Sequence, residues 1–508
     1  MATAPGAQLA AGPQNAPAAP APKKLAANLI LLVAGEFTAK LLTFASFSYL
    51  ARTLGPVDYG FIEFTLALMV FFTLPVDLGL GSYGAREIAR HPERAPQLLH
   101  EITGLRLFLS LCSMALLGIL ILFLNRSVRL KELLMLYGVS LLSAPFLLQW
   151  LFQGHDQMRW VALASIARQT GFAALVFLTF RHGTPLWYIG VFECASVAGA
   201  ALFCAYVARG PMRLAWPWPD LRIPQLIGHL KESSPIGLTD LAWGFMWYFC
   251  TVLLGLIFSD MTLGWWGASH RALMALHTFV WLYFFNLLPS ISRCALRSHR
   301  DLLDLMDESV RFTAWTGLLA GGLLMAVAPD LLSALFGPSF RNASHSFAVL
   351  VWMLPVAMLS GHHRYILIAY KQQGRLLWCM SLSAAAAVIL GLILVPRYSG
   401  TGAAWALLIA NTINFALVYV SVKRLIVEVP VHRQLVAPLI SLGFSSAVFF
   451  TLLRTNYWLA LAAACALYLA SFAWIGGRRL TSMLRMAAER HRAQEERRSA
   501  LAEPENSL

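Results

Sequence analysis

The chain has 508 residues, of which 58% are hydrophobic and only 13% are charged. A soluble globular chain is about 45–50% apolar and about 25% charged, so this composition excludes an ordinary soluble protein. The net charge of +14 does not indicate a nucleic-acid binder, because the basic residues lie between long apolar runs. We therefore expect an all-α polytopic membrane protein.

The two ends of the chain predict cytoplasmic tails. Residues 1–26 are rich in Ala and Pro, which is typical of disorder, and they lack the charged start and short apolar core of a cleaved signal peptide. Lys23 and Lys24 directly precede the first apolar run, and positive charge there favours the cytoplasmic side. Residues 477–508 are basic and predict a tail that either lies along anionic headgroups or is solvated.

Fourteen stretches are long and apolar enough to cross a bilayer, which takes about 20 residues. When the spans alternate in direction, most Lys and Arg residues fall on one side, and both termini then lie in the cytoplasm. The predicted spans are residues 27–51, 58–80, 103–125, 132–152, 159–180, 186–208, 234–258, 263–288, 312–336, 345–368, 376–396, 401–422, 434–454 and 456–476.

The spans divide into two lobes with two helices added. A Pro- and Trp-rich basic connection, residues 209–233, separates an N-terminal six-helix lobe at 27–208 from a C-terminal six-helix lobe at 234–424. Residues 425–476 hold two additional transmembrane helices. A shift of the chain by 204 residues places Glu36 on Asp240, which suggests that the two lobes are internal repeats, a plan common among transporters.

The first predicted span carries two opposite charges in the stretch GEFTAK. Glu36 and Lys40 are four residues apart and share one helix face, in the order that favours an ion pair. A charge at the bilayer centre costs roughly 2.5–3.5 kcal/mol, so this face must point toward something polar. Thr43 and Ser46 extend the same face, which therefore predicts a polar stripe on the bundle interior.

Other spans also carry charges at depth, and these define a candidate cavity. We assign substrate binding to Lys40, Arg168, Arg271, Arg364 and His270, because deep cations usually mark a substrate path and suit an anion such as phosphate. Glu36, Asp240 and Glu193 are candidates for ion coupling or for ion pairs. Several structural alternatives stay open: Glu193 as a plain partner of Arg168, Arg364 reaching the interface, and His270 as a packing histidine.

The sequence predicts neither a metal site nor a cofactor. Its seven cysteines are scattered and include no CxxC pair, so a disulfide framework or zinc site is not expected. No phosphate-binding loop is visible, which argues against ATP hydrolysis by this chain. A proton or sodium gradient would then supply the energy, with H⁺ or Na⁺ as the coupling ion.

Three motifs carry a family resemblance. They are ARTLGPVDYGFIEF at residues 51–64, PVDLGLGSYGAREIARHPE at 75–93 and LFGPSFRNASHSF at 335–347. Together they resemble the Wzx-type polysaccharide (O-antigen) flippases of the multidrug/oligosaccharidyl-lipid/polysaccharide (MOP) exporter superfamily. The span count and the plan of two halves extend the resemblance over nearly the whole chain.

The resemblance implies a V-shaped bundle of two six-helix lobes plus two peripheral helices. It implies a non-enzymatic flippase of the bacterial inner membrane that moves undecaprenyl-pyrophosphate-linked oligosaccharide to the periplasmic leaflet by alternating access, for O-antigen or exopolysaccharide synthesis. Polymerase and chain-length proteins would be partners. Lys40 and Arg271 match the family's basic cavity positions, with Lys40 in place of an expected Arg. The gate and motif candidates are Arg52, Asp77, Arg86, Glu87 and Arg90.

Three alternatives remain at this stage. An ion-coupled drug antiporter of the same superfamily would share the fold, but organic cations call for an acidic or aromatic cavity. A peptidoglycan-precursor flippase would differ only in the sugar. A membrane-integral polymerase or glycosyltransferase would call for a large outside loop or paired acids near an interface, and the sequence shows neither.

Overall fold

The computed structural model describes residues 22–214, 216–220, 223–258 and 261–475, and within these ranges it is helical and contains no strand. The all-α prediction is therefore confirmed. Most of the predicted N-terminal tail and all of the predicted C-terminal tail lie outside the described residues. The first helix begins at Pro22, before the predicted start of the first span.

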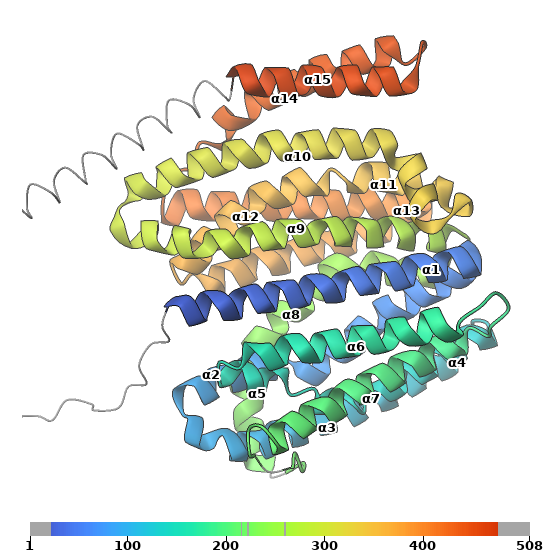
Figure 1. Cartoon of the computed structure of the whole chain (residues 1–508), viewed down its shortest axis with the longest axis vertical. Helices are drawn as coiled ribbons and strands as arrows, with labels where there is room; N and C mark the ends of the chain where they lie inside the picture. The colour runs from blue at the N-terminus through green and yellow to red at the C-terminus, as the bar shows by residue number, and fades with distance from the viewer. Residues whose placement is uncertain (1–21, 215, 221–222, 259–260, 476–508) are drawn as a thin grey trace, which may run out of the picture.

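The first half of the chain forms seven α-helices and two short 3₁₀ helices (Figure 1). They are α1 (Pro22–Asp77), α2 (Leu80–Arg90), η1 (Pro92–Arg94), α3 (Ala95–Phe123), α4 (Val128–Ser140), η2 (Ala144–Phe146), α5 (Gln149–Gly154), α6 (Met158–Thr179) and α7 (Trp187–Arg209).

The second half forms eight α-helices and one 3₁₀ helix. They are α8 (Ile223–Ile257), α9 (Met261–Arg297), α10 (His299–Phe336), η3 (Pro338–Ala343), α11 (Ser344–Leu350), α12 (Met353–Ala369), α13 (Gln373–Leu425), α14 (Val431–Leu452) and α15 (Tyr457–Ile475). Across the described residues, 12 helical segments are long and apolar enough to cross a membrane.

Helix α1 reverses direction at Gly55, so it contains two passes through the bundle. Gly55 has φ 74° and ψ 176°, which is not helical, and Pro56 follows it. Arg271 contacts both Phe47 and Glu63, eight residues on either side of Gly55. A continuous helix would hold these two residues about 24 Å apart, so the chain must fold back.

Helix α13 reverses at Ser399 in the same manner, with φ 51° and ψ −131° at that residue. Arg375 donates a hydrogen bond to Ser421 at 3.3 Å, although the two residues are 46 positions apart. A straight helix would separate them by about 69 Å. Each of these two reversed helices counts as one segment but makes two passes, so 12 helical segments agree with fourteen predicted spans. The number that cross a membrane stays a prediction.

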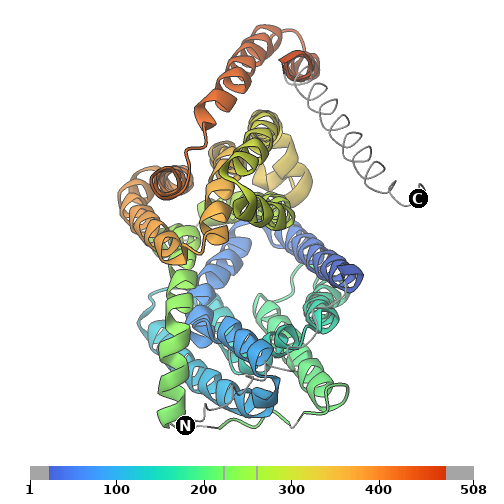
Figure 2. The same ribbon diagram turned by 90° about the vertical axis from the view of Figure 1, so that its left-hand side faces the viewer.

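The reversals define two ends of the bundle. The Gly55 end, at the right of Figure 1, holds the turn of α1 and the short helix η3. The Asp77 end, at the left, holds α2, α5 and the start of α10. Figure 2 views the molecule from the Asp77 end and shows α14 and α15 set apart at the upper edge. There α15 contacts α10, where the Tyr468 hydroxyl donates to the Trp315 carbonyl.

Small residues let α1 and α9 meet at close range near the Gly55 end. A Cβ added to Gly60 would lie 2.9 Å from the backbone nitrogen of Gly264, closer than real Cβ atoms approach. Such glycine pairs allow the backbones of membrane helices to pack directly. Next to them, the buried Tyr59 ring packs edge-on against Phe340 of η3, with ring centroids 5.6 Å apart.

Helix α8 begins at Ile223, so the predicted connection at 209–233 is shorter than expected. The cause is its contacts at the Asp77 end, where the buried His229 lies 2.8 Å from a Glu101 oxygen and 3.0 Å from the Tyr83 hydroxyl. Before the helix, the Asp220 N–H donates to the His100 carbonyl. The rest of α8 packs against α13 and α1, so this helix touches both halves of the bundle, as Figure 2 shows for the light-green helix at the left.

Candidate functional site

A polar pocket of about 190 Å³ lies between the first pass of α1, the start of α5 and α6. It brings together three of the predicted site residues, Glu36, Lys40 and Arg168. Lys40 is exposed, whereas the other lining residues are half-buried or buried. The remaining lining residues are Ala39, Thr43, Leu147, Gln149, Ala164, Ser165 and Gln169.

Hydrogen bonds between side chains hold the wall of this pocket. The Gln149 amide donates to the Ser165 hydroxyl at 2.9 Å, and that hydroxyl donates to a Glu36 carboxylate oxygen at 3.0 Å. On the same side of α6, Thr43 donates to the Gln169 carbonyl oxygen at 2.8 Å. The polar stripe of the first span therefore faces polar residues of α5 and α6, as its charges require.

The two cations of the pocket differ in their partners. Lys40 forms no ion pair within the described ranges, and the predicted pairing with Glu36 is not made. Arg168 is bound to Glu193 of α7, with 2.5 Å between a guanidinium nitrogen and the carboxylate. The alternative that Glu193 is the partner of Arg168 is thereby confirmed. The buried Nε of Arg168 has no hydrogen-bond partner among the described residues.

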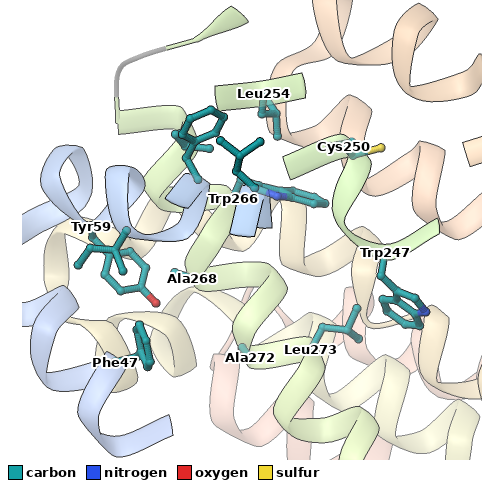
Figure 3. Close-up of a cluster of buried hydrophobic side chains, with 14 of the residues drawn as sticks. Phe47, Tyr59, Trp247, Cys250, Leu254, Trp266, Ala268, Ala272 and Leu273 are labelled. Atoms are coloured by element: carbon teal, nitrogen blue, oxygen red, sulfur yellow. The ribbon is translucent and has the colours of Figure 1, made fainter. Parts of the chain in front are cut away.

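Arg271 lies outside this pocket and pairs with Glu63, with 2.6 Å between Nε and the carboxylate oxygen. Its guanidinium carbon also lies 3.6 Å from the centre of the Phe47 ring, a cation–π contact. Figure 3 shows Phe47 and Tyr59, from the two passes of α1, in one apolar cluster with Ala268 and Ala272 of α9. Arg271 therefore joins α9 to both passes of α1.

Each of the two deep arginines is balanced by one carboxylate within the apolar bundle. Breaking either pair would leave an unpaired charge there, which is costly.

The other proposed cavity residues do not line the pocket. His270 is 4% exposed, and its ring stacks on Trp266 at 5.6 Å and packs against Tyr248. His270 therefore does not reach the pocket in this conformation, because aromatic rings of α8 and α9 enclose it. Arg364 on α12 is exposed, and Asp240 on α8 is half-buried. Neither joins Glu36 and Lys40.

The motif residues at the Asp77 end form two groups of ion pairs. Asp77 accepts hydrogen bonds from the buried Arg106 of α3 and from the backbone N–H of Gly81. Glu87 is surrounded by three arginines at 3.7–3.9 Å, namely Arg86, Arg90 and Arg94. Arg86 also reaches Glu232 of α8 at 4.0 Å, and this ion pair connects α2 to α8.

Arg52 lies at the opposite end and links the two lobes. Its Nε donates to the carbonyl of Leu335 at 3.1 Å, and its Nη2 donates to the carbonyl of Ala334. These carbonyls end α10 and have no partner in the helix, so a cation satisfies them well. The Gly55 end is therefore held together between α1 and α10 in this structure.

Sequence reasoning missed several residues of the site. Glu63, the partner of Arg271, lies in the quoted motif ARTLGPVDYGFIEF, and an acid in an apolar span was the signal that could have found it. Arg106, a basic residue within the predicted span 103–125, could have been found by its charge as well. Gln149, Ser165 and Gln169 carry no charge, and no pattern in one sequence marks them.

Comparison with solved structures places this helical bundle in a known class. It is similar to the lipid II flippase MurJ in an inward closed conformation, with a TM-score of 0.69 and 16% identity over 89% of this chain and 100% of that one. It is also similar to an inward-facing multidrug resistance MATE family transporter of the MOP superfamily, with a TM-score of 0.61 and 14% identity over 76% and 95%. The protein has the fold of a MOP-superfamily membrane transporter.

The family follows from the sequence comparisons. Residues 25–295, more than half of the chain, match the model of the polysaccharide biosynthesis protein family, and the chain belongs to that family. A curated relative from Escherichia coli (strain K12), named "Putative O-antigen transporter", is 23% identical over 325 residues, which cover 62% of this chain and 76% of the relative. The resemblance stated from the motifs is confirmed.

Proposed function

We propose that the protein is a flippase that moves undecaprenyl-pyrophosphate-linked oligosaccharide from the cytoplasmic to the periplasmic leaflet of the inner membrane, for O-antigen or exopolysaccharide synthesis. The observation that carries the proposal is the polar pocket inside an apolar bundle, with the unpaired and exposed ammonium of Lys40. An unpaired cation at such a place is costly unless an anionic partner or water meets it. The headgroup of such a lipid is an anion.

The proposed orientation has the Asp77 end in the cytoplasm. Arginines gather there, on α2, on η1 and at the end of α9, among them Arg86, Arg90, Arg94 and Arg297. Positive charge flanking spans favours the cytoplasmic side. The Gly55 end would then be periplasmic, and the contact between Arg52 and α10 would close the periplasmic side.

Alternating access then assigns different tasks to the proposed cavity cations. Lys40 is available to an anionic headgroup in the structure as it stands. Arg271 is held by Glu63 and would become available only when α9 moves away from α1. Arg364 is exposed on α12 and belongs to the opposite wall. Asp240, half-buried on α8, is the candidate carrier of a coupling proton or sodium ion.

The experiment is a flipping assay with the purified full chain in proteoliposomes that contain a lipid-linked oligosaccharide. Lys40→Glu should abolish flipping, because an acid would face the pyrophosphate in a site of low dielectric constant. Lys40→Arg should keep most of it, because the charge survives. Arg454→Glu makes the same charge change on the exposed connection between α14 and α15 and serves as the matched control. Full flipping by Lys40→Glu would refute the proposal.

A lipid II flippase is the second candidate, because this chain aligns with the MurJ structure over the whole length of MurJ. Both candidates carry a polyprenyl pyrophosphate and differ in the sugars. The same proteoliposomes, loaded in parallel with lipid II and with an O-antigen repeat unit, separate the two. Transport of the O-antigen lipid at more than the lipid II rate favours the first candidate.

A further inference from the structure

We propose that the pocket between α1, α5 and α6 is a sugar subsite: it holds one uncharged sugar ring of the transported lipid and not the pyrophosphate. This inference rests on the proposed function and deepens it. Its basis is the mixture of hydrogen-bond donors and acceptors that line the pocket, which differs from what an anion site requires.

The pocket offers unused groups of both kinds. The acceptors are one carboxylate oxygen of Glu36 and the side-chain carbonyl oxygen of Gln149. The other carboxylate oxygen of Glu36 and the NH₂ group of Gln149 are already hydrogen-bonded to Ser165. The donors are the amide of Gln169 and the ammonium of Lys40. A sugar hydroxyl both donates and accepts, so it can use every one of these groups.

A pyrophosphate could use only the donors. Its oxygens accept hydrogen bonds, and Glu36 and the Gln149 carbonyl would face them as further acceptors. Four charged side chains lie in the pocket or next to it, two positive (Lys40 and Arg168) and two negative (Glu36 and Glu193), and these charges balance. A balanced set does not compensate a dianion in a low-dielectric interior, whereas it suits a neutral, polar ligand.

The geometry also separates the sugar from the headgroup. The volume of about 190 Å³ suits a single ring and no chain of sugars. Lys40 is the one exposed lining residue, and the amides lie deeper, half-buried. A lipid whose sugar enters the pocket would therefore keep its pyrophosphate outside, next to Lys40. Lys40 would then attract the headgroup, while Gln149 and Gln169 bind the adjacent sugar.

The test measures binding to the full chain in nanodiscs. The probes are bare undecaprenyl pyrophosphate and undecaprenyl pyrophosphate with a single N-acetylglucosamine, glucose or galactose. The variants Gln149→Met and Gln169→Met remove an amide and keep its length. Gln153→Met, on the exposed face of α5 one turn beyond Gln149, is the matched control.

We expect at least one sugar-bearing lipid to bind wild type more tightly than the bare lipid. Each pocket variant should reduce that advantage by roughly fivefold, the usual effect of one hydrogen bond, and leave the Kd of the bare lipid unchanged. The control should behave as wild type.

Two results would overturn the subsite alone: equal binding of all lipids by wild type, or equal loss for bare and sugar-bearing lipids in both variants. The second would show that the amides act on the headgroup or on folding. Failure of wild type to bind any of these lipids would overturn the proposed function as well, so the two proposals fail in different ways.

Discussion

The two deep arginines occupy different mechanical settings. Arg168 and Glu193 come from α6 and α7, which are consecutive helices of one lobe, so their ion pair can persist while the lobes move. Arg271 and Glu63 come from α9 and α1, which belong to different lobes. Their ion pair therefore connects the two lobes, on the Gly55 side of the bundle. The same chemistry thus stabilises one lobe in the first case and one conformation of the whole bundle in the second.

The strongest way to break this contrast is Arg271→Glu, which sets two acids against each other at a nearly buried site. Losing a buried ion pair costs about 3–5 kcal/mol, so we expect flipping to be abolished and the closed Gly55 end to open. Proteoliposome flipping and membrane abundance measure the two effects. The exchanged pair Glu63→Arg with Arg271→Glu should recover abundance, and if it also recovers full flipping, Arg271 has no contact with substrate.

Removal of Arg168 should act on folding. Arg168→Gln leaves Glu193 without its partner, and because Arg168 is 37% exposed the cost should be smaller, roughly 1–3 kcal/mol. We expect a lower thermal midpoint and lower membrane abundance than for wild type. Adding Glu193→Gln should restore both, since no charge then remains unpaired. A double variant as unstable as the single one would show that the pair does not explain the loss.

The smallest expected effect belongs to Arg52. Arg52→Ala removes hydrogen bonds to the carbonyls at the end of α10, worth about 1–1.5 kcal/mol, and should shift the closed–open equilibrium of the Gly55 end about tenfold. Spin labels at Thr184 and Ser339, in a cysteine-free background, report the distance across this end. Arg129→Ala, an exposed arginine of the same end, is the control. An unchanged distance distribution would show that Arg52 does not hold the end closed.

The all-α membrane fold was predictable because it depends on the number and length of the apolar stretches. The polar surroundings of GEFTAK were predictable because two charged residues in an apolar run need polar neighbours. The Arg168–Glu193 pair was also within reach, since its two helices follow one another in the chain. These features are local, or nearly so, and one sequence contains them.

The features that escaped prediction depend on distant contacts. Arg271 and Glu63 are 208 residues apart, and only the crossing of α9 with α1 joins them. His270 is next to Arg271 in the sequence, but it lies on a different face of α9, so its ring packs among aromatic side chains. The two glutamines of the pocket are uncharged, so they lack the high free-energy cost in a membrane that draws attention to a charged residue. The start of α8 shifted because His229 finds its partners on α2 and α3.

The double attachment of α8 bears on how the protein is assembled during synthesis. The N-terminal helices leave the ribosome first, so α2 and α3 can already be in place when residues 223–237 emerge. The Tyr83 and Glu101 side chains then offer His229 a docking point long before α13, the neighbour of α8 in the second half of the chain, has been translated. The first lobe would thus act as a template that sets the position of the second.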